Sequence, residues 1–208
     1  MVKTLTTLAL FMFSFAIGQS KYEEGMQKGL QLWGEGKPVE ATAMFERIAA
    51  AEKSQWLPNY YIALVNTVSA FQTQDKTQIA ALLDKAQKAL DKEYDKATDN
   101  SEIAVMQAMI YTAYVASDPM TNAMKYSAQI MDLYEKAQKL DPKNPRAVFG
   151  KAEFEIGGAK YFGSDTTPMC QEIQRSIKMF EDFKPESAFH PKWGQDRAMA
   201  ALLECGKK

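Results

Sequence analysis

The chain has 208 residues, of which 25 are lysine or arginine and 26 are aspartate or glutamate, so its formal charge is −1. A nucleic-acid-binding protein needs a clustered excess of basic side chains, and this balance argues against that class. Apolar residues make up 46% of the chain and charged residues 25%, which is ordinary for a soluble protein and too apolar for a disordered one. We therefore expect one folded domain or one short repeat array.

The N-terminal sequence MVKTLTTLALFMFSFAIGQS has the order of a secretory signal. Lys3 provides the positive charge, an uncharged run extends from Thr4 to Ile17, and small residues precede the expected cleavage after Gly18. The apolar run is shorter than the ~20 residues of a membrane span. We expect residues 1–18 to be a signal peptide. Residues 19–208 are then expected to form an exported, periplasmic domain without a stable membrane span. The alternatives are an uncleaved anchor or a buried N-terminal helix.

Nine stretches carry apolar residues at the three- and four-residue spacing of amphipathic helices. In chain order they are residues 23–33, 39–53, 58–71, 77–94, 101–116, 120–140, 144–158, 168–183 and 193–205. Segments rich in Gly, Pro and Asp separate them, and no stretch alternates as a strand does. The pattern predicts an all-α fold in which successive helices form antiparallel pairs.

A spaced set of small and bulky residues indicates how the first two helices pack. Gly29 and Ala41 are small and permit a close helix crossing, while Phe45 fills the space one turn after Ala41. Gly36 ends the first helix, because Gly tolerates the left-handed conformation found there. Small and bulky residues in this order favour close helix pairs.

The segment YEKAQKLDPKNPRA, residues 134–147, marks another junction between helices. Pro142 cannot continue a helix, whereas Pro145 is tolerated at the first helical position. Upstream, Leu83 and Ala86 correspond to Tyr134 and Ala137 in a second copy of the Lys-Ala-Gln-Lys core.

Both patterns resemble the tetratricopeptide repeat (TPR), which has small, bulky, Gly, Ala and aromatic residues at this relative spacing. The resemblance implies a right-handed helical-repeat array, a TPR-like α-solenoid, of about four helix pairs plus a C-terminal capping helix. The equivalent positions Phe45, Leu83, Tyr134 and Ile177 are spaced more widely than the family period of 34 residues. A generic helical bundle is the alternative.

The last fifty residues resemble a class of exported repeat proteins from Gram-negative bacterial envelopes. In that class a Gly-rich loop precedes the last helix pair, and a His-Pro-x-Trp-Gly turn leads into a capping helix. Gly157, Gly158 and Gly163 correspond to that loop, and residues 190–194 to the turn. The resemblance implies a periplasmic helical scaffold and no catalytic residues.

Cys170 and Cys205 are the two cysteines of the chain. An oxidising compartment permits them to form a disulfide, and two buried free thiols are the alternative. The spacing of the two cysteines fits no zinc-binding pattern. His190 is the single histidine, so any catalytic pair of a nucleophile with a histidine base would have to use it. We expect His190 to be structural and Trp193 to close its turn on the core.

Two regions are candidates for ligand binding. The stretch GGAKYFGSDTTP, residues 157–168, is long for a connection between helices and is expected to be either a packed surface loop or a small-molecule site. The first helices of such pairs normally line the concave face of an array. The residues expected on that face are Glu23, Met26, Trp33, Tyr60, Glu102, Met109, Arg146, Phe149 and Glu153.

The sequence therefore favours a non-catalytic scaffold or adaptor without a cofactor. We expect it to bind a protein or peptide of the cell envelope through the concave face. The alternative is a small molecule or glycan bound at residues 157–168 for an uptake system. The residues expected to contact a protein partner are Trp33, Tyr60, Arg146, Phe149 and Glu153.

Overall fold

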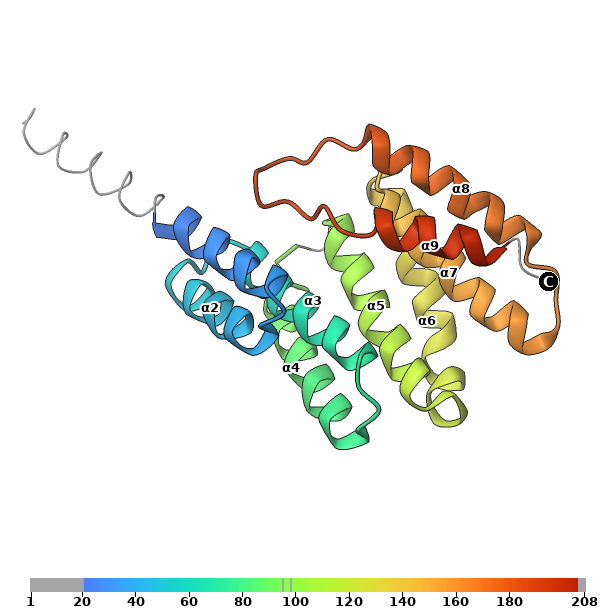
Figure 1. Cartoon of the computed structure of the whole chain (residues 1–208), viewed down its shortest axis with the longest axis horizontal. Coiled ribbons are helices and arrows are strands. Elements are labelled where there is room, and N and C mark those ends of the chain that lie inside the picture. Colours follow the sequence, from blue (N-terminus) through green and yellow to red (C-terminus); the bar gives the residue numbers. More distant parts are fainter. Residues whose placement is uncertain (1–20, 95, 98, 206–208) are drawn as a thin grey trace, which may run out of the picture.

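The structure, a computed structural model, describes residues 21–94, 96–97 and 99–205, and all regular structure within them is helical (Figure 1). A first helical segment covers residues 21–34. The helices that follow are α2 (Pro38–Ala51), α3 (Leu57–Phe71), α4 (Lys76–Tyr94), α5 (Ser101–Ser117), α6 (Pro119–Leu140), α7 (Pro145–Phe162), α8 (Thr167–Asp182) and α9 (Gln195–Cys205). The expected signal peptide, residues 1–18, lies outside the described residues. Among the residues described, we find no helix with the length and apolar character of a membrane span.

The helices form four successive pairs and a capping helix, as the sequence predicts. Segment 21–34 packs on α2 through Gly29 and Phe45, and α3 packs on α4, α5 on α6, and α7 on α8. The capping helix α9 packs on α8. Since α3 also contacts α5, and α5 contacts α7, the first helices of the pairs form one continuous surface, which we call the inner face.

Glycines allow helices that follow one another in the chain to approach closely, with a large ring filling the space opposite. A Cβ atom placed on Gly29 would lie 2.5 Å from Cε1 of Phe45, and one on Gly150 would lie 2.5 Å from Cε1 of Tyr134. Both rings are buried. The Gly29–Phe45 contact confirms the expected close crossing within the first pair, and Gly150 with Tyr134 makes a similar contact between the third and fourth pairs.

Replacing Gly150 by Ala should therefore destabilise the fold. The added methyl group meets the Tyr134 ring, and overpacking of this kind costs about 1–3 kcal/mol, against a helix-propensity gain of about 1 kcal/mol. Gly158→Ala is the matched control, because Gly158 is also helical but has open space around its Cβ direction. Urea unfolding should show a loss of stability for Gly150→Ala and a gain for Gly158→Ala. An equal gain for both would show that the Tyr134 contact is not restrictive.

The prediction of a loop at residues 157–168 is wrong, because α7 continues through Gly157 and Gly158 to Phe162. Gly163 ends the helix instead: its φ of 67° is left-handed, and the N–H of Ser164 donates to the Ala159 carbonyl at 2.8 Å. The connection to α8 is thus only residues 163–166. Tyr161 and Phe162 are 77% and 79% exposed and contact each other edge to face, so they are not packed on neighbouring helices.

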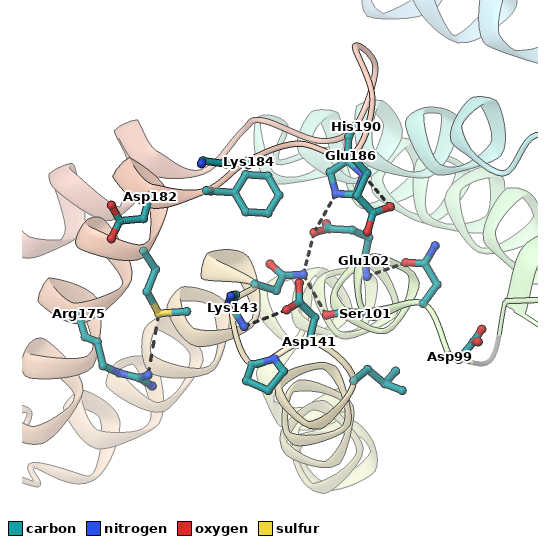
Figure 2. Close-up of a pocket in the computed structure, with 16 residues that line it drawn as sticks. Asp99, Ser101, Glu102, Asp141, Lys143, Arg175, Asp182, Lys184, Glu186 and His190 are labelled. Atoms are coloured by element: carbon teal, nitrogen blue, oxygen red, sulfur yellow. Dashed lines mark hydrogen bonds and ion pairs between the residues drawn. The ribbon is translucent and has the colours of Figure 1, made fainter.

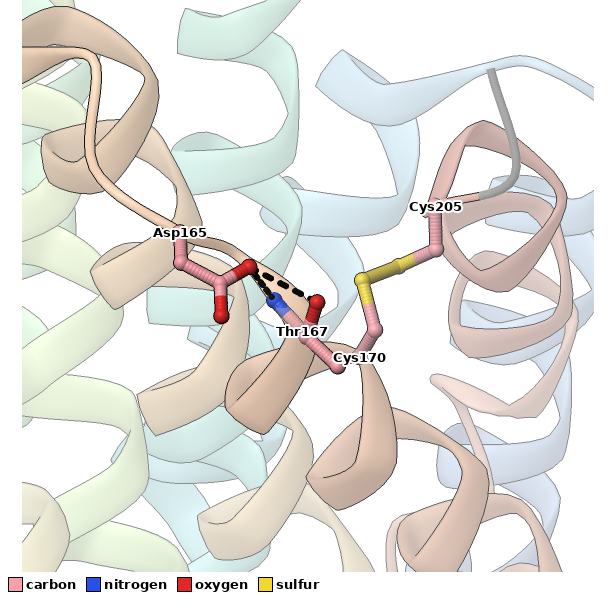
Figure 3. The surroundings of a disulfide bond; sticks show 4 residues. All are labelled: Asp165, Thr167, Cys170 and Cys205. Carbon is pink, nitrogen blue, oxygen red and sulfur yellow. Dashed lines mark hydrogen bonds between the residues drawn. A yellow bond between two sulfur atoms is a disulfide. The ribbon is translucent and has the colours of Figure 1, made fainter. Parts of the chain in front are cut away.

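The disulfide between Cys170 and Cys205 is present and joins the start of α8 to the end of α9 (Figure 3). The Cα atoms of the two cysteines lie 5.9 Å apart. Nearby, the Asp165 carboxylate accepts hydrogen bonds from the N–H and the hydroxyl of Thr167. Asp165 therefore orders the turn that leads into α8, with one of its carboxylate oxygens, Oδ1, accepting both bonds.

Between α8 and α9, residues 183–194 form an extended segment that we call the strap. Figure 1 shows the strap leaving α8, reaching back toward the first helices and returning to α9. Because the disulfide joins the far ends of α8 and α9, the strap is part of a covalently closed loop.

Candidate functional site

The strap lies on the N-terminal ends of the first helices and fills that half of the inner face. The Tyr61 hydroxyl donates to the Phe189 carbonyl at 2.9 Å, and the Trp193 indole N–H donates to the Tyr60 hydroxyl at 2.8 Å. The Phe189 ring also meets the Tyr22 ring edge to face, with 6.0 Å between centroids. The chain thus covers half of its own inner face with aromatic anchors.

Beneath the strap lies a buried ion pair between α5 and α7. Arg146 is 1% exposed and Glu102 is 3% exposed. Arg146 donates from Nε and Nη2 to the Glu102 carboxylate at 2.7–3.0 Å. Asn144 adds a hydrogen bond to Glu102 at 2.7 Å, and Tyr60 donates to its other oxygen at 3.4 Å. Both carboxylate oxygens are therefore occupied, which suits a structural role rather than proton transfer.

The strap completes the surroundings of this pair. The Arg146 guanidinium lies 4.5 Å from the centroid of the Phe183 ring and 6.0 Å from that of Trp193. Nε2 of His190 lies 4.0 Å from Glu102, and the His190 ring meets Trp56 edge to face. A cation between aromatic faces is stabilised by the ring quadrupoles. The expected structural role of His190 fits its burial in this contact.

Burial and charge shift the titration of these groups. Burial lowers the pKa of His190 below its ordinary value, and Arg146 acts in the same direction, against the carboxylates of Glu102, Glu186 and Asp141. Burial alone would lower the pKa of Arg146, but the Glu102 carboxylate outweighs it and the pKa is raised. Burial raises the pKa of Tyr60 well above its ordinary value. At neutral pH we therefore expect a charged Arg146 beside a neutral His190.

A polar cleft of about 1260 Å³ lies at the outer side of the strap (Figure 2). It is bounded by the start of α5, the turn between α6 and α7, the end of α8 and the strap, with Arg175 and Asp182 on α8. Glu102 and His190 reach it from the buried network. Acidic and basic side chains alternate around it, and its one buried carboxylate already binds Arg146.

A second, more apolar cavity of about 290 Å³ lies on the open half of the inner face, and we call it the inner cavity. Its lining residues come from α3, α5, α6, α7, the strap and α9. They are Phe71, Val105, Met109, Thr112, Ala116, Tyr134, Arg146, Phe149, Gly150, Glu153, Phe154, Trp193 and Arg197. Aromatic rings and aliphatic groups form most of this surface, and the charged lining residues are two arginines and one glutamate.

The charged edge of the inner cavity joins α7 to α9. Nε of Arg197 donates to both carboxylate oxygens of Glu153, at 2.9 and 3.1 Å. Burial raises the pKa of Glu153, and the neighbouring Arg197 opposes this shift. The Arg197 guanidinium also lies 6.0 Å from the centroid of the Phe71 ring, so it spans the mouth between α9 and α3.

The structure brings together some of the residues expected on the concave face and separates others. Arg146, Phe149 and Glu153 line the inner cavity, as does Met109, whereas Trp33 and Tyr60 lie outside its lining. Tyr60, Arg146 and Phe149 are buried rather than open to solvent. The strap, which sequence analysis placed in a turn and not on the inner face, covers Tyr60 and Arg146. Phe149 is buried in the core that α7 shares with α8 and α9.

Sequence analysis missed Phe71, Phe154 and Arg197 as candidate residues of this site. For Phe154 a signal was present, because it follows Gly150 by one turn on the same helix. Phe71 and Arg197 are far apart in sequence and meet only when α9 caps the array. In the part of the chain that the structure describes, no cluster of His, Cys, Asp or Glu side chains could hold a metal ion.

Stacked helix pairs, an inner face built by their first helices and a terminal capping helix define a TPR-like helical-repeat protein. Two solved structures share this architecture. The HusA haemophore from Porphyromonas gingivalis is 26% identical, with a TM-score of 0.77 over 89% of this chain and 92% of that one. A thermophilic TPR protein of Thermus thermophilus is 16% identical, with a TM-score of 0.61 over 90% of this chain and 92% of that one.

The similarity to the Thermus thermophilus protein shows the fold alone. The similarity to the haemophore extends over nearly the whole of both chains. One similar structure is a haemophore and the other a TPR protein, so neither likeness points to catalysis. The sequence matches no protein-family model, and the comparison with curated proteins gave no match.

Proposed function

We propose that the protein is a non-catalytic binding protein that takes a flat, apolar macrocycle of the porphyrin class into the inner cavity. The observation that carries the proposal is the inner cavity itself, a concave, largely aromatic site with a few charged groups at its edge. Such a composition is typical of small-molecule sites. The likeness to a haemophore supports the ligand class.

The size and shape of the cavity fit part of a flat ring. Its volume of about 290 Å³ is at the lower end of ligand sites, which hold about 300–1,000 Å³. One edge of a macrocycle therefore enters between α5 and α7, and the remainder lies across the half-buried rings of Phe71 and Phe154 at the mouth. In the described part of the chain the lining contains no His or Cys, and the proposal places the binding on the ring.

The other two readings of the sequence have weaker support. A peptide along the whole inner face requires the strap to leave it, because Phe189 and Trp193 occupy the half near the helix N-termini. A small-molecule site at residues 157–168 has less support, because residues 157–162 are helical and the Asp165 carboxylate accepts a hydrogen bond from the Thr167 N–H. We still propose a small molecule as the ligand, with the inner cavity as its site in place of residues 157–168.

We propose that the protein acts outside the cytoplasm, in the periplasm. The signal-like residues 1–18 and the Cys170–Cys205 disulfide support it, since disulfides persist in oxidising compartments.

The test is a titration of residues 19–208 with metal-free protoporphyrin IX, followed by the absorbance of the porphyrin. We expect a dissociation constant in the micromolar range or below, which corresponds to about 8 kcal/mol. Thr112→Phe places a ring in the cavity and should weaken binding at least about tenfold, because it removes the space for the macrocycle. Thr77→Phe, the same change at an exposed position of α4, should bind as the parent protein does. No binding by the parent, or equal binding by Thr112→Phe, would contradict the proposal.

A further inference from the structure

One donor of the buried ion pair has no hydrogen-bond acceptor. Nη1 of Arg146 is buried without a partner, although Nε and Nη2 of the same guanidinium both bind Glu102. Buried polar groups are almost always paired, because leaving a charged donor unpaired costs more than leaving a neutral one. The hydroxyl of Tyr22 and Oδ1 of Asn59 also lack partners, but neither residue lines the inner cavity.

The place of Arg146 connects this unpaired donor to the proposed ligand. Arg146 lines the inner cavity and does not line the polar cleft. Trp193 also lines the inner cavity and covers the guanidinium, and its indole N–H makes one hydrogen bond, to Tyr60. An acceptor that enters the cavity past Trp193 therefore approaches the Arg146 side chain.

We propose that Arg146 is the carboxylate receptor of the inner cavity, so that the site selects macrocycles with an acidic substituent over neutral ones. This inference rests on the proposed function. A guanidinium presents its donors in a planar fork that matches a carboxylate, and such charge-assisted hydrogen bonds are strong. Glu102 takes one side of the fork and leaves Nη1 for the ligand.

Arg197 is the competing residue, and the structure gives it a different role. Its Nε is bound to Glu153, and its side chain is more than half exposed. Contacts of an exposed arginine are screened by water and contribute little. Arg197 therefore orders the mouth of the cavity, while the buried Arg146 provides the selectivity.

The experiment compares metal-free protoporphyrin IX, which has two carboxylic acids, with its dimethyl ester, under identical detergent and salt conditions. The parent protein should bind the acid at least about tenfold more tightly than the ester. Arg146→Lys keeps a cation opposite Glu102 but lacks Nη1, and should reduce the preference to below about threefold. Arg197→Gln should keep it.

The outcomes test the inference about Arg146 separately from the proposed function. Equal affinity of the parent for acid and ester overturns the inference and leaves the proposed function standing. A preference that survives Arg146→Lys also overturns it, and its loss in Arg197→Gln would then make Arg197 the receptor. Failure of both porphyrins to bind overturns the proposed function, and this inference with it. If Arg146→Lys does not fold, a preference retained by Arg197→Gln supports Arg146, and its loss there overturns the inference.

Discussion

Replacing Arg146 by Met should cost about 3–5 kcal/mol of the free energy of unfolding, because it leaves the Glu102 carboxylate buried without its cation. The Arg146 side chain is the only member of the network that supplies a positive charge to this carboxylate at hydrogen-bond distance within the described residues. Urea unfolding followed by far-ultraviolet circular dichroism measures the change. A matched control is Arg175→Met, since the Arg175–Glu172 pair on α8 is about half exposed and should change stability by less than about 1 kcal/mol.

The double variant Glu102→Met, Arg146→Met separates the charge from the packing. Removing both partners removes the unpaired charge, so at least half of the lost stability should return. Recovery should remain incomplete, because the Asn144 amide and the Tyr60 hydroxyl lose the acceptor that Glu102 provides. A loss of less than about 1 kcal/mol in Arg146→Met, or no recovery in the double variant, would show that the pair is not the electrostatic centre of this fold.

Removing the disulfide, by Cys170→Ser with Cys205→Ser, should cost up to about 4 kcal/mol. The bond closes a loop of about 36 residues, and the loss of unfolded-state entropy from such a closure is worth about 4 kcal/mol. Because the loop contains α8, the strap and α9, the loss should be concentrated at this end of the array. Amide hydrogen exchange should show faster opening in residues 183–205 than in α3 and α4.

Reduction of the parent protein with dithiothreitol provides the control for this second result. Reduced parent and double-serine protein should unfold at the same urea concentration, and dithiothreitol should not change the double-serine variant. A stability difference of less than about 1 kcal/mol between oxidised and reduced parent would contradict the prediction. It would show that the packing of Phe180 and Ala198 is enough to hold α9 on α8.

The two results also bear on the ligand. The strap carries Trp193, which covers Arg146, and the disulfide fixes the ends of the helices that flank the strap. Stability of this end and access to the inner cavity are therefore coupled through the same segment. A protein without the disulfide should hold the strap less tightly on the inner face.

The sequence by itself indicated the helices and their pairs, and it favoured a disulfide over two free thiols. Helical spacing of apolar residues, Gly36 at a helix end, and Pro142 and Pro145 at the junction are local signals, because they depend on a residue and its near neighbours. The small-and-bulky contact of Gly29 with Phe45 was also predictable, since the repeat places both at a fixed spacing.

Only the tertiary structure decided where α7 ends and what covers the inner face. Gly157, Gly158 and Gly163 look alike in sequence, and the left-handed φ of Gly163 selects it as the end of the helix. The strap contacts Tyr22 and Tyr61, which are far from it in the sequence, and no periodicity encodes such a contact. Burial of Tyr60 and Arg146 follows from that long-range contact, and Phe149 is buried against α8 and α9. The sequence alone therefore indicated an open groove where the folded chain has a covered ion pair and a smaller cavity.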